Sequence, residues 1–490
     1  MSTRQEPAAE HVDVVIVGAG ISGIDAAYHL QHRCSGKSYL ILEGRERVGG
    51  TWDLFRFPGI RSDSDMYTLG FPFRPWRGEK AIVDGESIRT YVEDTAREFG
   101  IDRNIRFRHR VVRAAWSSAD ARWTVDADSP DGPRRFSASF LFLCSGYYDY
   151  EQGYRPVWPG EAGFRGETVH PQSWPEALEL NGKRVVVIGS GATAVTLVPA
   201  LAAQASHVTM LQRSPSYVVS RPSRDGIALW LQRRLPARLA GDAVRWKNLL
   251  LGIFFFSRAR KKPARVRAAI LKLAAEALPP GYDVEQAFGA RYNPWDQRLC
   301  LVPDADLFEA IKAGTVSVVT DTIERFEADG LRLASGAHLP ADIVVTATGL
   351  VLMMAGGIAL SVDGSEVSIA ERFSYKGMML SDLPNLAVSF GYTNASWTLK
   401  CDLTSRYVCR LLNHMDRRGL AICVPKLPPG GFERQPMLDF SSGYVTRAEG
   451  ALPHQGPEAP WRVHQNYLKD LRAMQFRSVE DGVMEFRKAG

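Results

Sequence analysis

The order of apolar and polar residues predicts two copies of one α/β pattern. Residues 12–17 are almost continuously apolar and β-branched, which is typical of a strand buried on both faces. A glycine-rich turn follows at 18–23, and residues 24–30 carry apolar side chains at helical spacing. Residues 184–188 and 189–194 repeat the strand and the turn. The chain is therefore expected to contain two doubly wound α/β units.

The other apolar runs indicate how these units are divided along the chain. They predict a helix over 91–99 and strands over 39–42, 106–112, 122–125, 140–144, 207–211, 316–320 and 343–346. The strand at 140–144 is followed by Ser145-Gly146 and the strand at 343–346 by Thr348-Gly349, which indicates a return to the first unit. We expect residues 1–146 and 346–490, with a C-terminal region, to form the first domain. Residues 147–345 would form a linker and the second domain.

One stretch departs from the α/β pattern and predicts an inserted helical subdomain at about 221–290. Residues 221–267 carry thirteen Lys or Arg and two Asp, and apolar residues at 249–256 have helical spacing. A buried helix with a basic, solvated face would explain this composition. A basic amphipathic patch that lies on an anionic membrane surface would explain it equally well.

Composition narrows the class of protein. The 490 residues are 45% hydrophobic and 23% charged, as in an ordinary soluble protein, and a net charge of +6 does not indicate nucleic-acid binding. None of the six cysteines forms a C-x-x-C pair, so we expect neither a metal site nor a redox disulfide. The polar residues 1–11 lack a signal core, and no apolar run reaches the ~18 residues of a membrane span. A cytoplasmic protein is expected, with peripheral contact to the inner face of the cell membrane as an option.

Each glycine-rich turn stands where a dinucleotide pyrophosphate would bind. Glycines let the backbone approach the phosphates, and the following helix N-terminus offers N–H donors and a positive dipole. We therefore predict two Rossmann-like dinucleotide-binding domains. The cofactor-binding candidates in the turns are Gly18, Gly20, Ser22 and Gly23 in the first and Gly189, Ser190, Gly191, Ala192, Thr193 and Ala194 in the second.

The residues at the ends of the next strands separate the two units. Glu43 lies twenty residues after Gly23, and Arg213 lies nineteen residues after Ala194. A carboxylate suits a free ribose hydroxyl, as in FAD, whereas an arginine suits the 2′-phosphate of NADPH. Alternatively, neither residue binds a ligand: Glu43 would be a solvated residue in a turn, and Arg213 an ordinary surface residue.

A loop between the first turn and the predicted helix at 91–99 offers a further set of candidates. It contains Gly49-Gly50-Thr51-Trp52-Asp53 and Phe57-Pro58-Gly59-Ile60-Arg61-Ser62-Asp63. Its small residues, with Trp52, Arg61 and Asp63, could pack a flavin ring and reach a second nucleotide. A core tryptophan beside a surface Arg/Asp pair is the alternative.

The segment between the two units has residues at fixed spacing. It reads Phe164-x-Gly166-x-x-x-His170-x-x-x-Trp174-Pro175. Its proline and glycine alone would indicate an ordinary linker turn. Together with both glycine-rich turns and the 49–63 loop, however, it resembles the fingerprint of class B flavoprotein monooxygenases of the Baeyer–Villiger type. The resemblance extends over nearly the whole chain.

That resemblance implies FAD, NADPH and molecular oxygen. It also implies a C4a-peroxyflavin that inserts an oxygen atom next to a ketone carbonyl, forming an ester or lactone. No Ser, Cys or metal nucleophile is needed when the cofactor supplies the nucleophile. The protein must exclude water and stabilise negative charge.

The resemblance also assigns roles to individual residues. Arg298 matches the catalytic arginine and Asp63 its acidic partner. Contacts to NADPH are expected from Arg61, Ser62, Arg213 and Ser214. Contacts to FAD are expected from Thr51, Trp52 and Asp53. The backbone of Val111 would contact an adenine. His170 would couple domain movement to cofactor position and is not expected to act as a base. Tyr392 and Trp397 are candidates for the substrate pocket.

Other functions stay open. The same oxygenating chemistry acts on softer nucleophiles, so oxygenation of thioethers, thioamides or amines could accompany or replace ketone oxidation. A non-catalytic nucleotide sensor at the membrane surface is a third possibility, and intact Arg298 and Asp63 argue against it. The expected partners are a small ketone or sulfur compound and O2, with residues 221–267 as the membrane-contact candidate.

Overall fold

The computed structural model describes residues 9–489, and its two sheets confirm the expected α/β class. Five parallel strands of the larger sheet lie in the order β3-β2-β1-β6-β23. Their bounds are β1 (Glu10–Val17), β2 (Tyr39–Leu42), β3 (Ile105–Arg106), β6 (Arg134–Leu143) and β23 (Leu386–Val388). The last of these strands comes from the C-terminal third, so the chain does return to the first sheet.

The same sheet continues on the β6 side into an extension that is antiparallel except where β19 runs parallel to β4. It consists of β4 (Arg110–Ser117), β5 (Arg122–Asp128), β19 (Ala359–Val362) and β20 (Ser365–Val367). One strand had been expected over 106–112, but the structure has β3 and β4 there. The chain turns between them, where Arg108 adopts φ 58°.

Three helices pack on one face of the first sheet: α1 (Ile21–Arg33), α4 (Gly85–Glu98) and α11 (Trp397–Arg418). Helix α11 ends at Gly419, whose φ of 60° is easily adopted by glycine and closes the last turn. The other face is covered by the antiparallel extension and the C-terminal segments.

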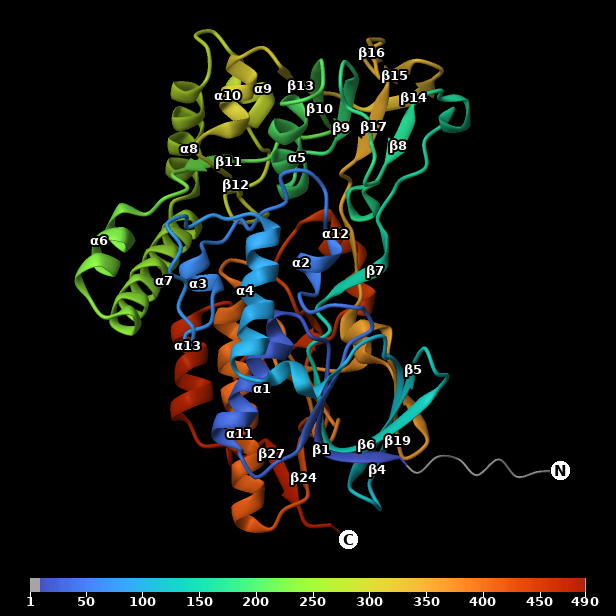
Figure 1. The fold of residues 1–490 in the computed structure, drawn as a ribbon, viewed down its shortest axis with the longest axis vertical. Helices are drawn as coiled ribbons and strands as arrows, with labels where there is room; N and C mark the ends of the chain where they lie inside the picture. The colour runs from blue at the N-terminus through green and yellow to red at the C-terminus, as the bar shows by residue number, and fades with distance from the viewer. Residues whose placement is uncertain (1–8, 490) are drawn as a thin grey trace, which may run out of the picture.

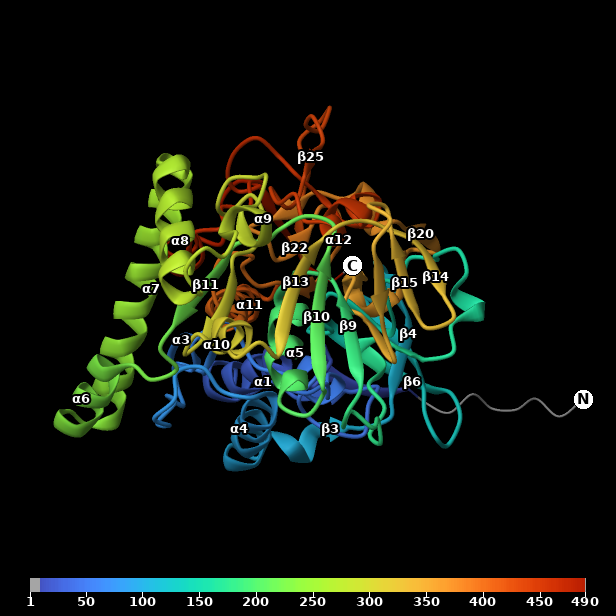
Figure 2. The same cartoon turned by 90° about the horizontal axis from the view of Figure 1, so that it is seen from above.

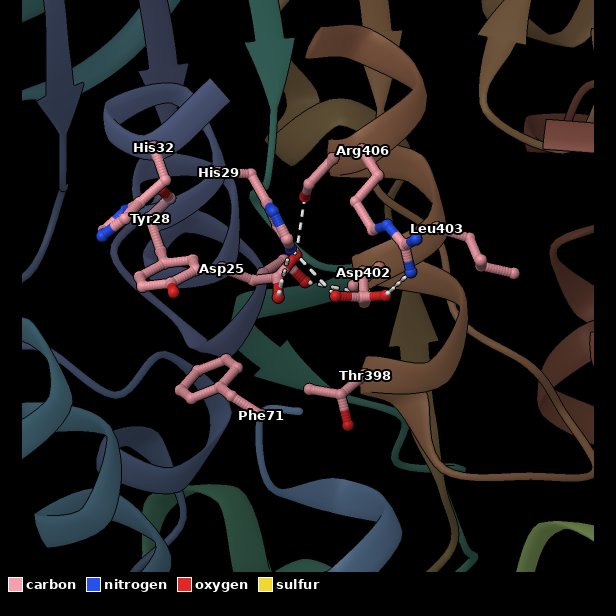
Figure 3. A network of polar contacts seen from close by, with 12 residues as sticks. Asp25, Tyr28, His29, His32, Phe71, Thr398, Asp402, Leu403 and Arg406 are labelled. Carbon is pink, nitrogen blue, oxygen red and sulfur yellow. Dashed lines mark hydrogen bonds and ion pairs between the residues drawn. The ribbon is translucent and has the colours of Figure 1, made fainter. Parts of the chain in front are cut away.

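Residues of α1 and α11 form a buried polar network between these two helices (Figure 3). His29 Nε2 lies 2.9 Å from Asp402 Oδ1, and Ser405 Oγ donates to Asp25 Oδ2 at 2.7 Å. Arg33 Nε donates to His29 Nδ1, so Nε2 must carry the proton that bonds to Asp402. Ligand atoms of Asp25, His29 and Asp402 lie within 4.8 Å of one another. With both ring nitrogens engaged, we interpret this group as a bond between helices.

The second sheet is parallel throughout, in the order β13-β10-β9-β17-β8, and stands above the first in Figure 1. Its strands are β8 (Glu167–Val169), β9 (Arg184–Ile188), β10 (His207–Gln212), β13 (Val316–Thr320) and β17 (Ile343–Thr346). Helices α5 (Ala192–Ala202) and α10 (Asp306–Lys312) pack in the same core as its strands.

The segment expected to be a helical insertion contains α6 (Gly226–Arg234), α7 (Ala237–Lys261), α8 (Pro263–Ala277) and α9 (Val284–Phe288). Pro263 starts α8, where its missing N–H is not needed. Strands β11 (Val218–Arg221) and β12 (Cys300–Pro303) pair at the two ends of this segment. Figures 1 and 2 show α6 and α7 projecting from one side of the molecule. No helix among residues 9–489 is both long and apolar enough to cross a membrane.

Short elements complete the described chain. The small sheets pair β7 (Tyr148–Gly153) with β18 (Leu350–Leu352), β21 (Ser374–Tyr375) with β22 (Met379–Leu380), β24 (Ile422–Pro425) with β27 (Met484–Arg487), and β25 (Gln435–Pro436) with β26 (His454–Gln455). A three-stranded sheet contains β14 (Ile323–Glu327), β15 (Gly330–Leu333) and β16 (His338–Pro340). The remaining α-helices are α2 (Thr51–Leu54), α3 (Met66–Leu69), α12 (Gly443–Arg447) and α13 (Tyr467–Leu471).

Candidate active site

A cavity of about 980 Å³ is lined by residues from both α/β units. It receives the first glycine-rich turn, the 49–63 loop and the start of α5, which follow the carboxyl ends of parallel strands, where open α/β sheets bind ligands. The predicted site residues that line it are Gly18, Gly20, Ser22, Glu43, Thr51, Trp52, Asp53, Arg61, Ser62, Asp63, Val111, Ala192, Thr193, Arg298, Tyr392 and Trp397.

The first glycine-rich turn leaves no room for side chains. Gly18 has φ 103°, and a Cβ there would lie 2.7 Å from the carbonyl oxygen of Cys144. A Cβ on Gly23 would lie 1.9 Å from the carbonyl oxygen of Gly18, so Gly23 supports the turn from behind and does not line the cavity. Gly20 faces the backbone of Gly50 across the cavity wall. This cradle of bare backbone fits a pyrophosphate group.

Glu43 lies at the end of β2, as expected for a ribose-binding acid. Its Oε2 accepts the Ala19 N–H at 2.6 Å and its Oε1 accepts the Arg45 N–H at 2.8 Å. Burial raises the pKa of Glu43, and the two backbone N–H groups oppose that rise. The two bonds fix the orientation of the carboxylate at the cavity wall.

Two charged candidates of the 49–63 loop already have protein partners. Asp53 receives Arg45 Nη2 at 2.6 Å and Arg56 Nη2 at 3.3 Å, one on each carboxylate oxygen. Arg61 Nη1 donates to Asp306 of α10 at 2.5 Å. Asp53 therefore orders the loop, and Arg61 ties the loop to the second unit, while both line the cavity.

Arg298 and Asp63 form a bidentate pair at the cavity wall, although 235 positions separate them. Arg298 Nε lies 2.6 Å from Asp63 Oδ2, and Arg298 Nη2 lies 2.9 Å from Oδ1. The Arg298 side chain remains 32% exposed. The Asp63 charge raises the pKa of Arg298 in spite of its partial burial. The site thus holds a permanent cation whose plane the carboxylate orients.

The loop that carries Arg298 is anchored by the residue two positions further on. Cys300 is buried at the start of β12, and its Sγ lies 3.6 Å from the carbonyl oxygen of Ser190 in the second glycine-rich turn. The position of the cation is therefore coupled to the second nucleotide-binding turn.

An aromatic wall lies beside Arg298, and Trp397 is its only member that the sequence predicted as a site residue. The hydroxyl oxygens of Tyr147 and Tyr148 lie 2.6 Å apart, and the Tyr147 ring stacks on Trp397 at 4.8 Å. Burial raises the pKa of both tyrosines, while the charge of Arg298 opposes the rise. Both residues follow Cys144-Ser145-Gly146 at the carboxyl end of β6, and that position was the available sequence signal. Tyr444 of α12 is a third such phenol, and no sequence signal indicated it.

The two substrate-pocket candidates both line the cavity but present different groups. Trp397 Nε1 donates to Ser22 Oγ at 2.8 Å, which joins the aromatic wall to the first turn. The Tyr392 hydroxyl donates to Asp470 at 2.7 Å, and Asp470 also pairs with Lys400. Tyr392 can therefore offer its ring, but not its hydroxyl, to a ligand.

Most of the second glycine-rich turn lies outside this cavity, as do Arg213 and Ser214. Gly189 has φ 135°, and a Cβ there would lie 2.3 Å from the carbonyl oxygen of Ala347. Ser190 Oγ donates to the carbonyl oxygen of Ser214 at 3.1 Å. Arg213 is exposed and has no ion pair with any residue in 9–489. A free cation beside bare backbone suits a phosphorylated ribose.

A second cation near Arg213 was missed by sequence reasoning. Arg447 of α12 places its guanidinium carbon 3.5 Å from the centre of the Tyr154 ring. Burial lowers the pKa of Arg447, and the nearby Arg213 charge adds to that effect while Tyr154 opposes it.

The linker fingerprint does not touch the cavity. Its residues lie around β8, where a Cβ on Gly166 would come 2.3 Å from the carbonyl oxygen of Asp342. Phe164 packs on Phe326. His170 Nδ1 accepts the Gln172 N–H at 3.2 Å, and burial lowers the pKa of His170. Trp174 packs at the margin of the second unit's core and is followed by Pro175. The fingerprint thus occupies the connection between the units, and Gln172 within it donates to the carbonyl oxygen of Asp149, the residue after Tyr148.

Comparison with known proteins places the chain in a family. Residues 70–240 match the family described as flavin-binding monooxygenase-like, and residues 16–77 match the NAD(P)-binding Rossmann-like domain. The chain is 58% identical over 480 residues to FAD-containing monooxygenase EthA of Mycobacterium tuberculosis, covering 98% of each chain. It is 45% identical over 484 residues to a probable FAD-binding monooxygenase, AlmA, of an Acinetobacter species, covering 98% of this chain and 97% of that one.

Solved structures share the fold. A steroid monooxygenase bound to NADP superposes with a TM-score of 0.77 at 22% identity, covering 98% of this chain and all of that one. Cyclohexanone monooxygenase in its open form gives a TM-score of 0.72 at 20% identity with the same coverage. Full-length identity to EthA, rather than these distant likenesses, decides the family, and it confirms the resemblance seen in the motifs. The chain belongs to the FAD-containing, flavin-binding monooxygenases.

Proposed function

We propose that this protein binds FAD and NADPH and inserts one atom of O2 next to a ketone carbonyl, producing an ester or lactone. Ketone, O2, NADPH and a proton would yield the ester, NADP⁺ and water. The observation that carries the proposal is the bidentate Arg298–Asp63 pair, which holds a cation at the wall of the cavity between the two glycine-rich units.

The residues fit both dinucleotides. The cradle of Gly18, Gly20 and Gly50 with Glu43 suits FAD, and Arg213 with the Gly189 turn suits NADPH. Bound flavin, reduced by NADPH, supplies the oxygen-inserting chemistry. The protein itself must bind and orient the cofactors and the substrate, and it must keep water out of the cavity.

Arg298 is proposed as the catalytic residue because ketone oxygenation develops negative charge on the carbonyl oxygen. A guanidinium already oriented by Asp63 meets that charge without reorganising during the reaction. The wall of Tyr147, Tyr148 and Trp397 would shield the reacting groups from water and place an apolar substrate against the cation.

Oxygenation of sulfur compounds is a second proposed activity. The stacked rings of Trp397 and Tyr147, with Phe390 at 5.4 Å from Trp397, form a surface on which a thioether or thioamide would pack favourably. The non-catalytic nucleotide sensor is disfavoured because the Arg298–Asp63 pair is assembled.

Product analysis over a panel of ketones and thioethers tests both proposals. With NADPH and labelled O2, we expect substrate-stimulated NADPH consumption and esters that carry one labelled oxygen atom. Sulfoxides without any ester would leave only S-oxygenation. If NADPH were consumed with no oxygenated product from any substrate, both proposals would fail.

We also propose that the enzyme works in the cytoplasm, where an anionic membrane surface meets residues 221–267. The supporting observation is the projection of α6 and α7 from the body, with basic and apolar side chains exposed together.

A further inference from the structure

Exposed apolar side chains are concentrated on the helical insertion. Thirteen large apolar side chains are exposed among residues 9–489, and ten of them lie between positions 227 and 273. Monomeric soluble proteins rarely gather so many on one surface unless it binds something. These ten are Ile227, Trp230, Leu235, Leu239, Trp246, Leu250, Leu251, Phe254, Phe255 and Leu273.

Four of these side chains form one stripe along α7. Leu239, Trp246, Leu250 and Phe254 follow each other at intervals of seven, four and four residues, which places them on a single helix face. Leu250 is 49% and Phe254 57% exposed. A stripe that normally faces a protein core here faces outward.

Unpaired cations surround the stripe. Seven exposed Arg or Lys residues of α6, α7 and the start of α8 form no ion pair within the described part of the chain: Arg233, Arg234, Arg238, Arg258, Lys261, Lys262 and Arg265. Of the two acids in this stretch, Asp225 is paired with Lys247. Apolar side chains among free cations match an anionic lipid surface. A second copy of the same face is a poor partner because the cations would oppose one another.

The inner side of α7 lies against the cavity wall. Leu249 is buried with Tyr392 and Leu399, and Ile253 and Ala395 pack on that group. Tyr392 and Ala395 both line the cavity. Arg245 fixes the helix by donating to the carbonyl oxygens of Tyr67, Thr68 and Gly70. One helix, roughly 10 Å across, therefore separates the outward stripe from the cavity.

We propose that α6 and α7 dock the enzyme on an anionic bilayer and that apolar ketones dissolved in the lipid enter the cavity past α7. The delivery step rests on the proposed function, whereas docking does not. The proposal narrows the substrate class to ketones that partition into membranes.

Vesicle flotation tests docking without any catalysis. The full-length holoenzyme should float with phosphatidylcholine vesicles that contain phosphatidylglycerol, and floating should fall as salt rises. The double variant Leu250→Glu/Phe254→Glu should lose at least ten-fold in vesicle binding. Val157→Glu/Phe476→Glu, which changes two exposed apolar residues elsewhere, should bind as the unchanged protein does. Flavin absorbance and circular dichroism confirm that each variant is folded.

Docking is overturned if the unchanged protein does not float at low salt. It is also overturned if the α7 variant floats as well as the control. The face could instead join two copies of the protein. If the unchanged protein does not float and forms a dimer that the α7 variant converts to a monomer, docking on a bilayer is overturned.

Rates on two ketones test delivery. Anionic vesicles should raise the oxidation rate of a long-chain ketone several-fold in the unchanged protein and not in the α7 variant. A short, water-soluble ketone should react equally in both, with and without vesicles. If the short ketone reacts and vesicles do not help the long one, delivery is overturned. If neither ketone reacts but the protein floats, docking stands and the proposed ketone oxidation fails.

Discussion

At the scale of residues, the site depends on charges whose partners are fixed before any ligand arrives. Arg298 is held by two bonds to Asp63, whereas Arg213 is exposed and has no ion pair within the described part of the chain. A preorganised cation suits transition-state stabilisation because it need not move as charge develops. A free surface cation suits recognition of a mobile cofactor's phosphate. The two arginines are therefore expected to affect different steps.

Loss of Arg298 should affect oxygen transfer more than flavin reduction. We expect Arg298→Ala to bind FAD and be reduced by NADPH, while ester formation falls by about 10²–10³. Stopped-flow reduction followed by product analysis separates the steps. Arg298→Lys keeps a positive charge but loses the bidentate geometry. Its rate of ester formation should therefore lie between those of the unchanged protein and Arg298→Ala. Near-normal ester formation by Arg298→Ala would show that another residue stabilises the charge.

Loss of Arg213 should weaken NADPH specifically. A charge-assisted contact with the 2′-phosphate is worth about 1.5–3 kcal/mol, or roughly 10- to 150-fold in affinity. Arg213→Ala should therefore raise KM for NADPH and leave KM for NADH unchanged. Arg122→Ala, which removes an exposed arginine from the β5 hairpin, serves as the control. Equal losses for the two nucleotides would refute the assignment.

At the scale of elements, α1 and α11 are joined by buried ionisable groups rather than by apolar contacts alone. Asp25 is fully buried, and its Oδ1 has no hydrogen bond among the described residues but lies 3.8 Å from His29 Nε2 (Figure 3). Burial raises the pKa of Asp25 to about 7, and the neighbouring His29 opposes the rise. For Asp402, burial acts in the same direction, but the hydrogen bond from His29 lowers its pKa overall. Within one network, the Asp25 carboxyl thus favours the protonated form and the Asp402 carboxyl the ionised form.

The raised pKa of Asp25 predicts a pH dependence of stability. The unfolded carboxyl titrates near its ordinary pKa of about 3.9, so between about pH 4 and 7 the folded protein retains a proton that the unfolded chain releases. The contribution of Asp25 to the free energy of unfolding therefore falls by at most about 4 kcal/mol as the pH rises from about 4 to 7. Asp25→Asn cannot titrate and should show a smaller fall in Tm between pH 5 and pH 8 than the unchanged protein. Parallel Tm curves for the two proteins would contradict this.

At the scale of the whole molecule, the cavity depends on the two units being joined. Asp63 and Arg61 lie on a loop of the first unit, and their partners Arg298 and Asp306 belong to the second. Phe55 and Phe57 of the same loop are buried in the second unit's core. Movement between the units would therefore shift the Arg298 guanidinium relative to the first glycine-rich turn. The domain boundaries at 146 and 345 and the coupling role of His170 stay predictions.

All six cysteines are free and buried, which predicts slow reaction of the native thiols. Burial raises the pKa of Cys300, Cys401 and Cys423 to about 12, so few thiolates form at neutral pH. A disulfide reagent should label the folded protein slowly and all six cysteines in guanidinium. Cys34 should react first, because its contact with Cys409 lowers its pKa. Cys34→Ala should remove the fastest phase, and rapid labelling of several native thiols would disagree with the structure.

Local features were readable from the sequence because short segments determine them. Continuous apolar runs before glycine-rich turns indicated both sheets, and the close contacts of Gly18 and Gly189 leave space only for backbone. Glu43 and Arg213 could be placed because one helix and one strand separate each of them from its glycine-rich turn. The family resemblance depended on such local motifs, and the full-length comparison confirmed it.

The family resemblance implied that Asp63 is the partner of Arg298, but only the tertiary structure showed how these and other distant residues meet. Arg298 and Asp63 lie 235 positions apart, so their bond depends on how the second unit packs on the 49–63 loop. The same packing paired Asp53 with Arg45 and Arg56, turned the Tyr392 hydroxyl to Asp470, and assembled Tyr147 with Trp397. For residues 221–267, composition suited a buried and a membrane-facing helix equally. The structure shows that one face of α7 is buried and another is exposed, which composition could not tell because burial depends on what else the chain brings near. Contact of the exposed face with a membrane stays a proposal.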